Sequence, residues 1–264
     1  RGGAGTRGTL PRGGGRTRRG PAGTARAPAA CAPDPGSRGR GVIYSAAPGG
    51  STPRARAPSR APALPTAFYD RDAAVVAREL LGAVLVCETE AGLASGRIVE
   101  TEAYLGPDDP ACHAVSGRTA RTEHLFGPPG RAYVYLIYGM HWCFNAVTRE
   151  EGHGSAALVR ALEPLEGVEL MRARRRGPRH DRDLTNGPAK LCEALAITRE
   201  HDGLSLVRST LTIRRGAEVP GRDVVVTPRI GITRAADWPL RYFVAGSDCV
   251  SRTPPHFPRE SLPG

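Results

Sequence analysis

The sequence predicts an α+β protein, with a single compact domain built around a curved antiparallel β-sheet and flanking helices. Residues 65–264 contain short apolar segments at strand spacing, close enough together to pair as hairpins, and only a few segments at helical spacing. About 200 residues are enough for one sizeable hydrophobic core. Residues 1–64 differ so much in composition that we expect them to form a disordered Arg/Gly/Pro-rich arm.

The predicted arm carries the net charge of the chain. Residues 1–64 contain 12 Arg, 14 Gly and 9 Pro, and Asp34 is their only acidic residue, which gives a charge of +11. Such a segment buries too little apolar surface to compensate for the entropy lost on ordering. Codon bias of a GC-rich genome, or translation from a start upstream of the true one, is the favoured explanation of this arm. The alternative is a sequence-independent contact with phosphates.

The rest of the chain excludes several classes of protein. Residues 65–264 carry 25 basic and 25 acidic residues, so nucleic-acid binding by the domain has to come from local patches. No signal peptide and no apolar run of 18 residues occurs, which predicts a soluble cytoplasmic protein without a membrane partner. The six cysteines form no CxxC pair, so we expect reduced thiols, no metal ion and no other cofactor.

The periodicity predicts the elements in order. Apolar residues at helical spacing predict a first helix with Asp70 as its N-cap and Gly82 at its end. A hairpin follows, with strands at residues 83–89 and 96–105 joined by a turn at residues 91–95. Further predicted strands are residues 131–139, 140–148, 156–164, 204–208, 211–215, 229–232 and 241–246, and further predicted helices are residues 164–174 and 188–196.

Two carboxylates and a phenol alternate along the second strand of that hairpin. In GRIVETEAY, Glu100, Glu102 and Tyr104 project from one face of the strand. Taken alone the segment is most simply a solvated strand face, but a nearby His113 and a tyrosine-rich strand favour a functional site. Because both acids share the face, the residues themselves do not decide which one is a general base.

Three of the seven tyrosines lie within six positions, in YVYLIYGMHWCFN. Tyr133 and Tyr135 share a strand face, whereas Tyr138 lies at the strand end before Gly139, where a turn can direct its ring outward. Two aromatic rings and a histidine can enclose a planar heterocycle, which predicts a nucleobase pocket. An exposed aromatic side chain at a turn can fill the gap that an extruded nucleotide leaves in the base stack. For Tyr133 the sequence suggests only a core role.

Four motifs together resemble the alkyladenine (3-methyladenine) DNA glycosylase family: GRIVETEAYLGPDDPACH, YVYLIYGMHWCFN, LVRALEPLEG and NGPAKLCEAL. They occur in family order between about residue 67 and residue 251, and the Met140–His141 pair resembles the bacterial members. The resemblance implies a monofunctional, monomeric base-excision-repair enzyme without a cofactor, associated with the nucleoid. Its partner would be double-stranded DNA containing damaged purines, alkylated ones first and deaminated ones as a further candidate class.

The resemblance also assigns roles residue by residue. It makes Glu102 the general base that activates water and places Arg160 beside that water. The residues that it assigns to the flipped base are Tyr104, His113, Tyr135 and, as a screen for exocyclic groups, Asn145. The residues that it assigns to DNA are the intercalating wedge Tyr138, together with Met140, Arg118, Arg121 and Lys190.

Two basic features leave alternatives open. The segment MRARRRGPRH, residues 171–180, either grips phosphates or is a solvated helix end. Lys190 is the only lysine, and we interpret it as a phosphate contact or a structural residue rather than the amine of a lyase. Ala120 stands in GRTART where a proline would be more usual, which predicts a less rigid loop near DNA.

Two other functions compete with the glycosylase. One is a noncatalytic damaged-DNA or nucleic-acid-binding relative, whose arm would supply most of the affinity. The other is a two-carboxylate glycoside hydrolase, which is disfavoured because acids two positions apart on one strand cannot flank a sugar from opposite sides.

Overall fold

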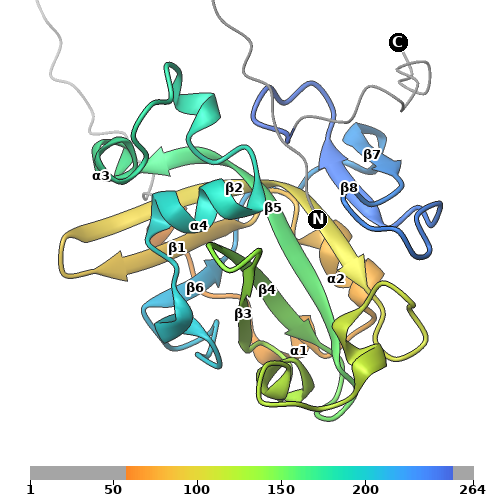
Figure 1. Ribbon diagram of the computed structural model, residues 1–264. Helices are drawn as coiled ribbons and strands as arrows, with labels where there is room; N and C mark the ends of the chain where they lie inside the picture. Colours follow the sequence, from red (N-terminus) through yellow and green to blue (C-terminus); the bar gives the residue numbers. More distant parts are fainter. Residues whose placement is uncertain (1–57, 252–264) are drawn as a thin grey trace, which may run out of the picture. The chain divides into compact units, whose positions relative to one another are not determined.

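Within the described part of the chain, residues 58–251, all strands pair antiparallel in one open sheet. The computed structural model thus confirms the predicted α+β class (Figure 1). The strands are β1 (Val84–Thr89), β2 (Gly92–Tyr104), β3 (Ala132–Ile137), β4 (His141–Thr148), β5 (Ser155–Glu166), β6 (Leu211–Arg214), β7 (Val224–Thr227) and β8 (Arg241–Val244). The α-helices are α1 (Thr66–Tyr69), α2 (Ala73–Glu79), α3 (Val168–Arg174) and α4 (Pro188–Leu195). Short 3-10 turns are η1 (Pro58–Arg60), η2 (His113–Ser116), η3 (Glu123–Phe126), η4 (Asp181–Asp183), η5 (Arg199–His201) and η6 (Gly221–Asp223).

The long strand β2 organises the sheet. Its one edge pairs along almost its whole length with β5, while its other edge is divided between β1 in the first half and β8 in the second. The strand order β3-β4-β5-β2-β1-β6 follows, with β7 attached through β8. The second half of β2 is therefore flanked by β5 and β8, two strands that are distant from it in sequence.

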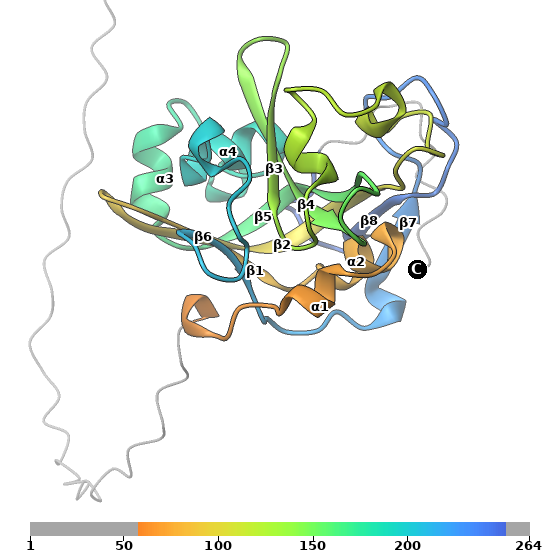
Figure 2. The same ribbon diagram turned by 90° about the horizontal axis from the view of Figure 1, so that it is seen from below.

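Helices cover both faces of the sheet. Figure 2 shows α1 and α2 on one face, and α3 and α4 on the other, from which the β3–β4 hairpin also projects. On the first face, the Thr101 hydroxyl donates to the carbonyl oxygen of Ala77 in α2 at 2.7 Å. Because strand residues alternate between faces, Glu100 and Glu102 lie on the other face. The fold thus directs the acidic residues toward the hairpin.

Two predicted boundaries near the N-terminus were wrong. The N-cap of α2 is Asp72, whose side chain accepts from the Ala74 N–H at 2.8 Å, whereas Asp70 ends the separate short helix α1. The predicted turn at residues 91–95 belongs to β2, which begins at Gly92. Residues 58–64, on the arm side of the predicted boundary, pack on the sheet, where the Leu64 N–H donates to the Ile213 carbonyl oxygen at 2.8 Å.

The C-terminal strands were predicted least well. Residues 229–232 form an irregular loop and residues 204–208 a turn, whereas β7 was not predicted. Pro228 precedes the loop and Gly231 within it has φ +79°, so neither end of the segment suits a regular strand. The helix predicted from residue 164 begins later, at Val168, because β5 continues to Glu166.

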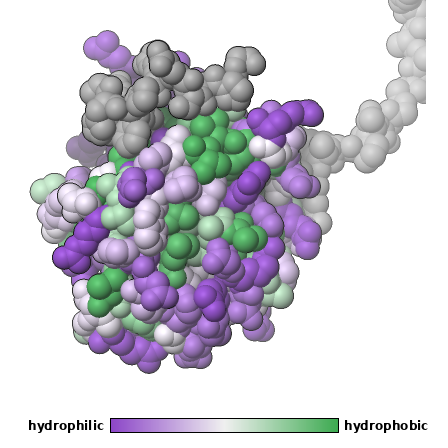
Figure 3. All heavy atoms as spheres, turned by 90° about the vertical axis from the view of Figure 1, so that its right-hand side faces the viewer, coloured by the Kyte–Doolittle hydropathy of each residue, from purple (hydrophilic) through white to green (hydrophobic). Residues whose placement is uncertain are grey.

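The described residues combine a surface of mixed hydropathy with buried thiols. On the side of β7 and β8, hydrophobic side chains gather in small patches between hydrophilic ones (Figure 3). The five cysteines of the described residues are all free and buried. None of the helices between residues 58 and 251 is long and apolar enough to cross a membrane.

Gly82, between α2 and β1, lies where no side chain fits. Its φ is +86°, and a Cβ there would lie 1.9 Å from the Ala217 carbonyl oxygen. We expect Gly82→Ala to lower the free energy of unfolding by about 3 kcal/mol or more, because overpacking adds to the cost of positive φ. Urea unfolding measures this. Gly152→Ala is the control, since its φ is +93° in open space, and it should cost only about 1 kcal/mol; equal losses would contradict the prediction.

Candidate active site

The two carboxylates of β2 are buried and share one guanidinium. Glu100 and Glu102 are both 0% exposed, so the interpretation as a solvated strand face was wrong. Arg160 from β5 donates through Nε to Glu100 Oε1 at 3.1 Å, and its Nη1 lies 3.1 Å from Glu102 Oε2. An unpaired charge here would be very unfavourable, so the two acids and the arginine depend on one another.

Bulges bring Arg160 to this position. Of the three register shifts in the β2–β5 ladder, the two on either side of Glu100 compensate each other and leave Val99 on β2 and Arg160 on β5 without direct partners. A bulge bends the strand locally and changes the direction of a side chain. The Arg160 guanidinium can therefore reach both Glu100 and Glu102.

Glu102 is held by donors from three segments. Its Oε1 accepts from the backbone N–H of Ile230 at 2.7 Å, and its Oε2 accepts from the Tyr104 hydroxyl at 3.0 Å in addition to Arg160. Tyr104, Arg160 and Ile230 all line a cavity of about 320 Å³. The carboxylate thus lies directly behind the wall that its partners form.

A buried ion pair places the Ile230 loop against Glu102. Arg229 contacts both oxygens of Asp109, with Nη2 at 2.8 Å from Oδ1, and its guanidinium carbon lies 4.7 Å from the centre of the Tyr104 ring. Burial acts to raise the pKa of Asp109, but hydrogen bonds from Arg229 and from the amides of Leu105 and Ala111 hold it below its ordinary value. One ion pair therefore joins the Ile230 loop to the segment that leads to His113.

Three aromatic side chains form the opposite wall. The rings of Tyr133 and Tyr135 stack with centroids 5.3 Å apart, and His113 meets the Tyr135 ring edge-on at 4.6 Å. The Tyr133 hydroxyl lies 2.9 Å from His113 Nδ1, so this tyrosine fixes the orientation of the histidine. Across the β3–β4 pair, Asn145 Nδ2 donates to the Tyr133 carbonyl oxygen at 3.1 Å. The cavity is lined by Tyr104, Ala111, Cys112, His113, Leu125, Tyr133, Tyr135, Ile137, Tyr138, Cys143, Asn145, Ala156, Leu158, Arg160, Pro188, Ile230, Gly231 and Ile232.

Tyr138 stands at the tip of the β3–β4 hairpin. It is 82% exposed, and both Tyr138 and Gly139 have positive φ, 53° and 70°. The Met140 N–H donates to the Ile137 carbonyl oxygen at 3.2 Å, which closes a two-residue turn of the type that favours Asn-Gly. A bulky residue with positive φ is strained, yet the turn projects the ring outward as predicted.

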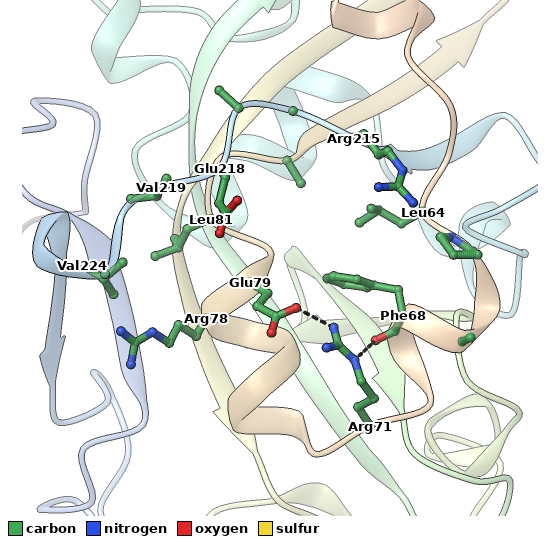
Figure 4. Close-up of a pocket in the computed structure, with 16 residues that line it drawn as sticks. Leu64, Phe68, Arg71, Arg78, Glu79, Leu81, Arg215, Glu218, Val219 and Val224 are labelled. Carbon is green, nitrogen blue, oxygen red and sulfur yellow. Dashed lines mark hydrogen bonds and ion pairs between the residues drawn. The ribbon is translucent and has the colours of Figure 1, made fainter.

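A larger cavity, of about 820 Å³, lies at α1 and α2 (Figure 4). Two of its charged residues satisfy each other, because Arg71 donates to Glu79 Oε2 at 2.7 Å and to the Phe68 carbonyl oxygen at 2.9 Å. None of the predicted site residues lines this cavity. The aromatic cavity is therefore the candidate active site, although it is the smaller one.

Comparisons with known proteins show the family of the chain. A family model described as methylpurine-DNA glycosylase (MPG) matches residues 67–248. A protein from Myxococcus xanthus, named "Putative 3-methyladenine DNA glycosylase", is 52% identical to this chain over 195 residues. The match covers 73% of this chain and 95% of that relative. A relative of the same name from Methanoculleus marisnigri is 52% identical over 192 residues, covering 72% of this chain and 98% of the relative.

The chain belongs to the methylpurine-DNA glycosylase family. The resemblance carried by its four motifs is confirmed, and the chain is a DNA glycosylase, a hydrolase of DNA repair.

The predicted DNA-contacting residues of the glycosylase lie in different settings. Met140 is 69% exposed beside Tyr138 at the hairpin tip. Arg118 and Arg121 are exposed. Arg118 donates to the carbonyl oxygen of Phe126 at 3.0 Å, and Arg121 donates to that of Leu136 in β3 at 3.1 Å. The Lys190 ammonium donates to Asn186 Oδ1 at 2.6 Å.

The arginine-rich segment of the glycosylase is paired in part within the protein. Arg172 forms ion pairs with Glu169 and Asp181, and Arg175 forms one with Glu193. These ion pairs involve two of the five arginines of residues 171–180. Arg174 donates to a backbone carbonyl oxygen, that of Ala194, at 3.0 Å.

Sequence reasoning missed several residues that build this site. Arg229 and Ile230 were interpreted as part of a strand, and Asp109 was not singled out. The proline before Arg229 and the glycine after Ile230 were the available signals of an ordered loop. For Tyr133, whose hydroxyl orients His113, no local signal exists, because its partner is 20 residues away.

His113 gives the glycosylase a pH-dependent stability. Burial, and then the positive charge of Arg121, lower the pKa of His113, so folding favours the neutral imidazole. Above a pH of about 6.5, the pKa of histidine in the unfolded chain, His113 is neutral in both states and costs the folded protein no stability. As the pH falls from there toward the lower pKa of the folded state, the unfolded chain binds the proton more readily and the folded protein loses stability. We expect the free energy of unfolding to decrease from about pH 7 to about pH 5, and His113→Gln to make that decrease smaller. Urea unfolding across this range measures it, with the exposed His180→Gln as control; an unchanged pH slope in His113→Gln would contradict the assignment.

Proposed function

We propose that the chain is a monofunctional purine DNA glycosylase that extrudes an alkylated purine from duplex DNA and hydrolyses its N-glycosidic bond with a water activated by Glu102. The observation that carries the proposal is the position of this carboxylate. It lies at the wall of an aromatic cavity, held by Arg160, Tyr104 and Ile230, with an exposed aromatic at the hairpin tip that also lines that cavity. The names of the relatives suggest 3-methyladenine as one substrate.

The chemistry follows from charge. A purine alkylated at N3 or N7 is positively charged and already a good leaving group, so bond cleavage needs mainly a base that activates water. Among the described residues, Glu102 is the only carboxylate with three hydrogen-bond or ion-pair partners that line the cavity. A well-placed general base contributes roughly 10²- to 10⁴-fold to such a step. The Arg160 guanidinium keeps the carboxylate paired and would lie beside the water.

The other titratable groups of the cavity favour a cationic substrate. Burial raises the pKa of Tyr104 and Tyr135, and raises that of Cys143 to about 11. His113, with its lowered pKa, is neutral at pH 7. None of these groups is a ready acid for a neutral leaving purine, whereas tyrosine faces attract a positively charged ring. We therefore place alkylated purines before deaminated ones, with Asn145 as the screen for exocyclic groups.

Base extrusion explains the hairpin tip. A base in a duplex cannot reach a cavity lined by buried side chains, so the nucleotide has to rotate out of the stack at a cost of a few kcal/mol. The Tyr138 ring can fill the gap, in the manner of other aromatic or apolar wedges. A lyase step would need an amine near the sugar, and Lys190 neither lines the cavity nor lies in its wall.

Glu102→Gln tests the proposed base. The variant keeps the size of the side chain but cannot accept a proton, so we expect release of methylated purines from duplex DNA to fall by roughly 10²- to 10⁴-fold. DNA binding should change little. The measurement is base release by the full-length protein, with gels run with and without alkali. Strand breaks only after alkali support a monofunctional enzyme, and undiminished release by the variant would refute the role of Glu102.

The strained tip offers a second test. Tyr138→Asn places a residue that tolerates positive φ in the turn, so we expect the protein to gain up to about 1 kcal/mol of stability while base release falls. Urea unfolding and single-turnover release measure the two effects. Arg149→Asn is the control, because Arg149 has φ 61° outside the cavity and should gain stability without losing activity. Unchanged release by Tyr138→Asn would argue against a wedge.

A further inference from the structure

Both carboxylate oxygens of Glu100 accept hydrogen bonds within the protein, although the residue lies beside Glu102 on the same strand face. Its Oε1 accepts from Arg160 Nε at 3.1 Å, Arg241 Nε at 2.6 Å and the Ser251 hydroxyl at 2.8 Å. Its Oε2 accepts from the Ser251 N–H at 2.7 Å. The side chain is fully buried, as that of Glu102 is, but only one of its partners, Arg160, lines the aromatic cavity, whereas all three partners of Glu102 line it. The geometry therefore favours Glu102 over Glu100 as the general base, a choice that the residues alone left open.

The Arg160 guanidinium connects the two carboxylates. Its Nε is bound by Glu100 and its Nη1 contacts Glu102 at 3.1 Å. A guanidinium is planar and rigid, so fixing Nε also fixes the direction of Nη1. We infer that Glu100 is a positioning residue: it holds Arg160 in the orientation in which the arginine pairs with Glu102. This inference rests on the proposed function of Glu102.

The charges around Glu100 explain why an acid is needed at this position. Arg160 and Arg241 approach it from strands on either side of β2, one from β5 and one from β8. With Glu102 they form a buried group of two acids and two arginines. Without the charge of Glu100, both guanidinium groups would compete for Glu102, and Arg160 would lose the contact that sets its direction.

Glu100→Gln in the full-length protein tests the inference, with single-turnover release from methylated duplex DNA as the assay. We expect the rate at saturating enzyme to fall by about tenfold to one hundredfold, because hydrogen bonds to a charged group are lost from the side chain that orients Arg160. The Kd for duplex DNA with an unreactive abasic-site analogue should stay within about twofold. Glu163→Gln is the matched control, since this glutamate of β5 pairs with Arg97 outside the site, and its rate should be that of the wild type.

A double-mutant cycle separates positioning from general destabilisation. If Glu100 acts through Arg160, the variant carrying both Glu100→Gln and Arg160→Gln should be no slower than Arg160→Gln alone. Rate losses that multiply would overturn the inference. So would a folded Glu100→Gln with the wild-type rate.

A second variant covers the case in which Glu100→Gln does not fold. Combining it with Arg241→Gln removes one buried charge of each sign, so we expect this protein to fold and to retain the slow rate. A wild-type rate in this variant would overturn the inference. If Glu102→Gln loses base release while Glu100→Gln keeps it, only this inference fails; if the wild type releases no base, the proposed function itself fails, and the inference with it.

Discussion

The antiparallel pairing of β2 with β5 is the constraint on which the site depends. It places Glu100 and Glu102 opposite the one stretch of β5 that contains Arg160, and the compensating bulges let that guanidinium reach both acids. The pairing of β2 with β8 adds Arg241 from the other edge. Because a shift by one residue would turn every side chain of β2 to the opposite face, the hydrophobic register of the sheet also fixes the charged groups.

The candidate active site contains two locally unfavourable features, a group of buried charges and a tyrosine with positive φ. Four charged side chains are buried around β2, and desolvating them is costly unless every partner is present. Tyr138 occupies a turn position better suited to asparagine. The buried charges are surrounded by well-packed structure, which includes a continuous core on the side of α2, whereas the conformation of Tyr138 is set by the two-residue turn that closes the β3–β4 hairpin. Strain of this kind persists only where neighbouring packing determines the conformation.

Local pattern was sufficient for part of this site and insufficient for the rest. The alternation of Glu100, Glu102 and Tyr104 and the outward turn at Tyr138 follow from strand geometry and a glycine, so they could be predicted. The hydrogen bond from Ile230 could not be predicted, because Ile230 lies in an irregular loop 128 residues after Glu102 in the sequence. Likewise, the burial of the two acids depends on Arg160 and Arg241, which periodicity cannot pair with them. The family resemblance singled out Glu102, and the proposal that it is the base is supported by its three partners, which all line the cavity.

The same interactions limit how the glycosylase can distinguish its substrates. Two arginines of the segment 171–180, Arg172 and Arg175, are paired with acids of the domain, and residues 65–264 are neutral overall. Global attraction to phosphates therefore contributes little to selectivity within this domain. On the proposed mechanism, discrimination arises in the cavity, where tyrosine and histidine rings would face a base whose charge depends on its damage. A normal purine offers neither the positive charge nor the weak glycosidic bond, so the proposed base Glu102 would be enough for the damaged purine and too little for the intact one.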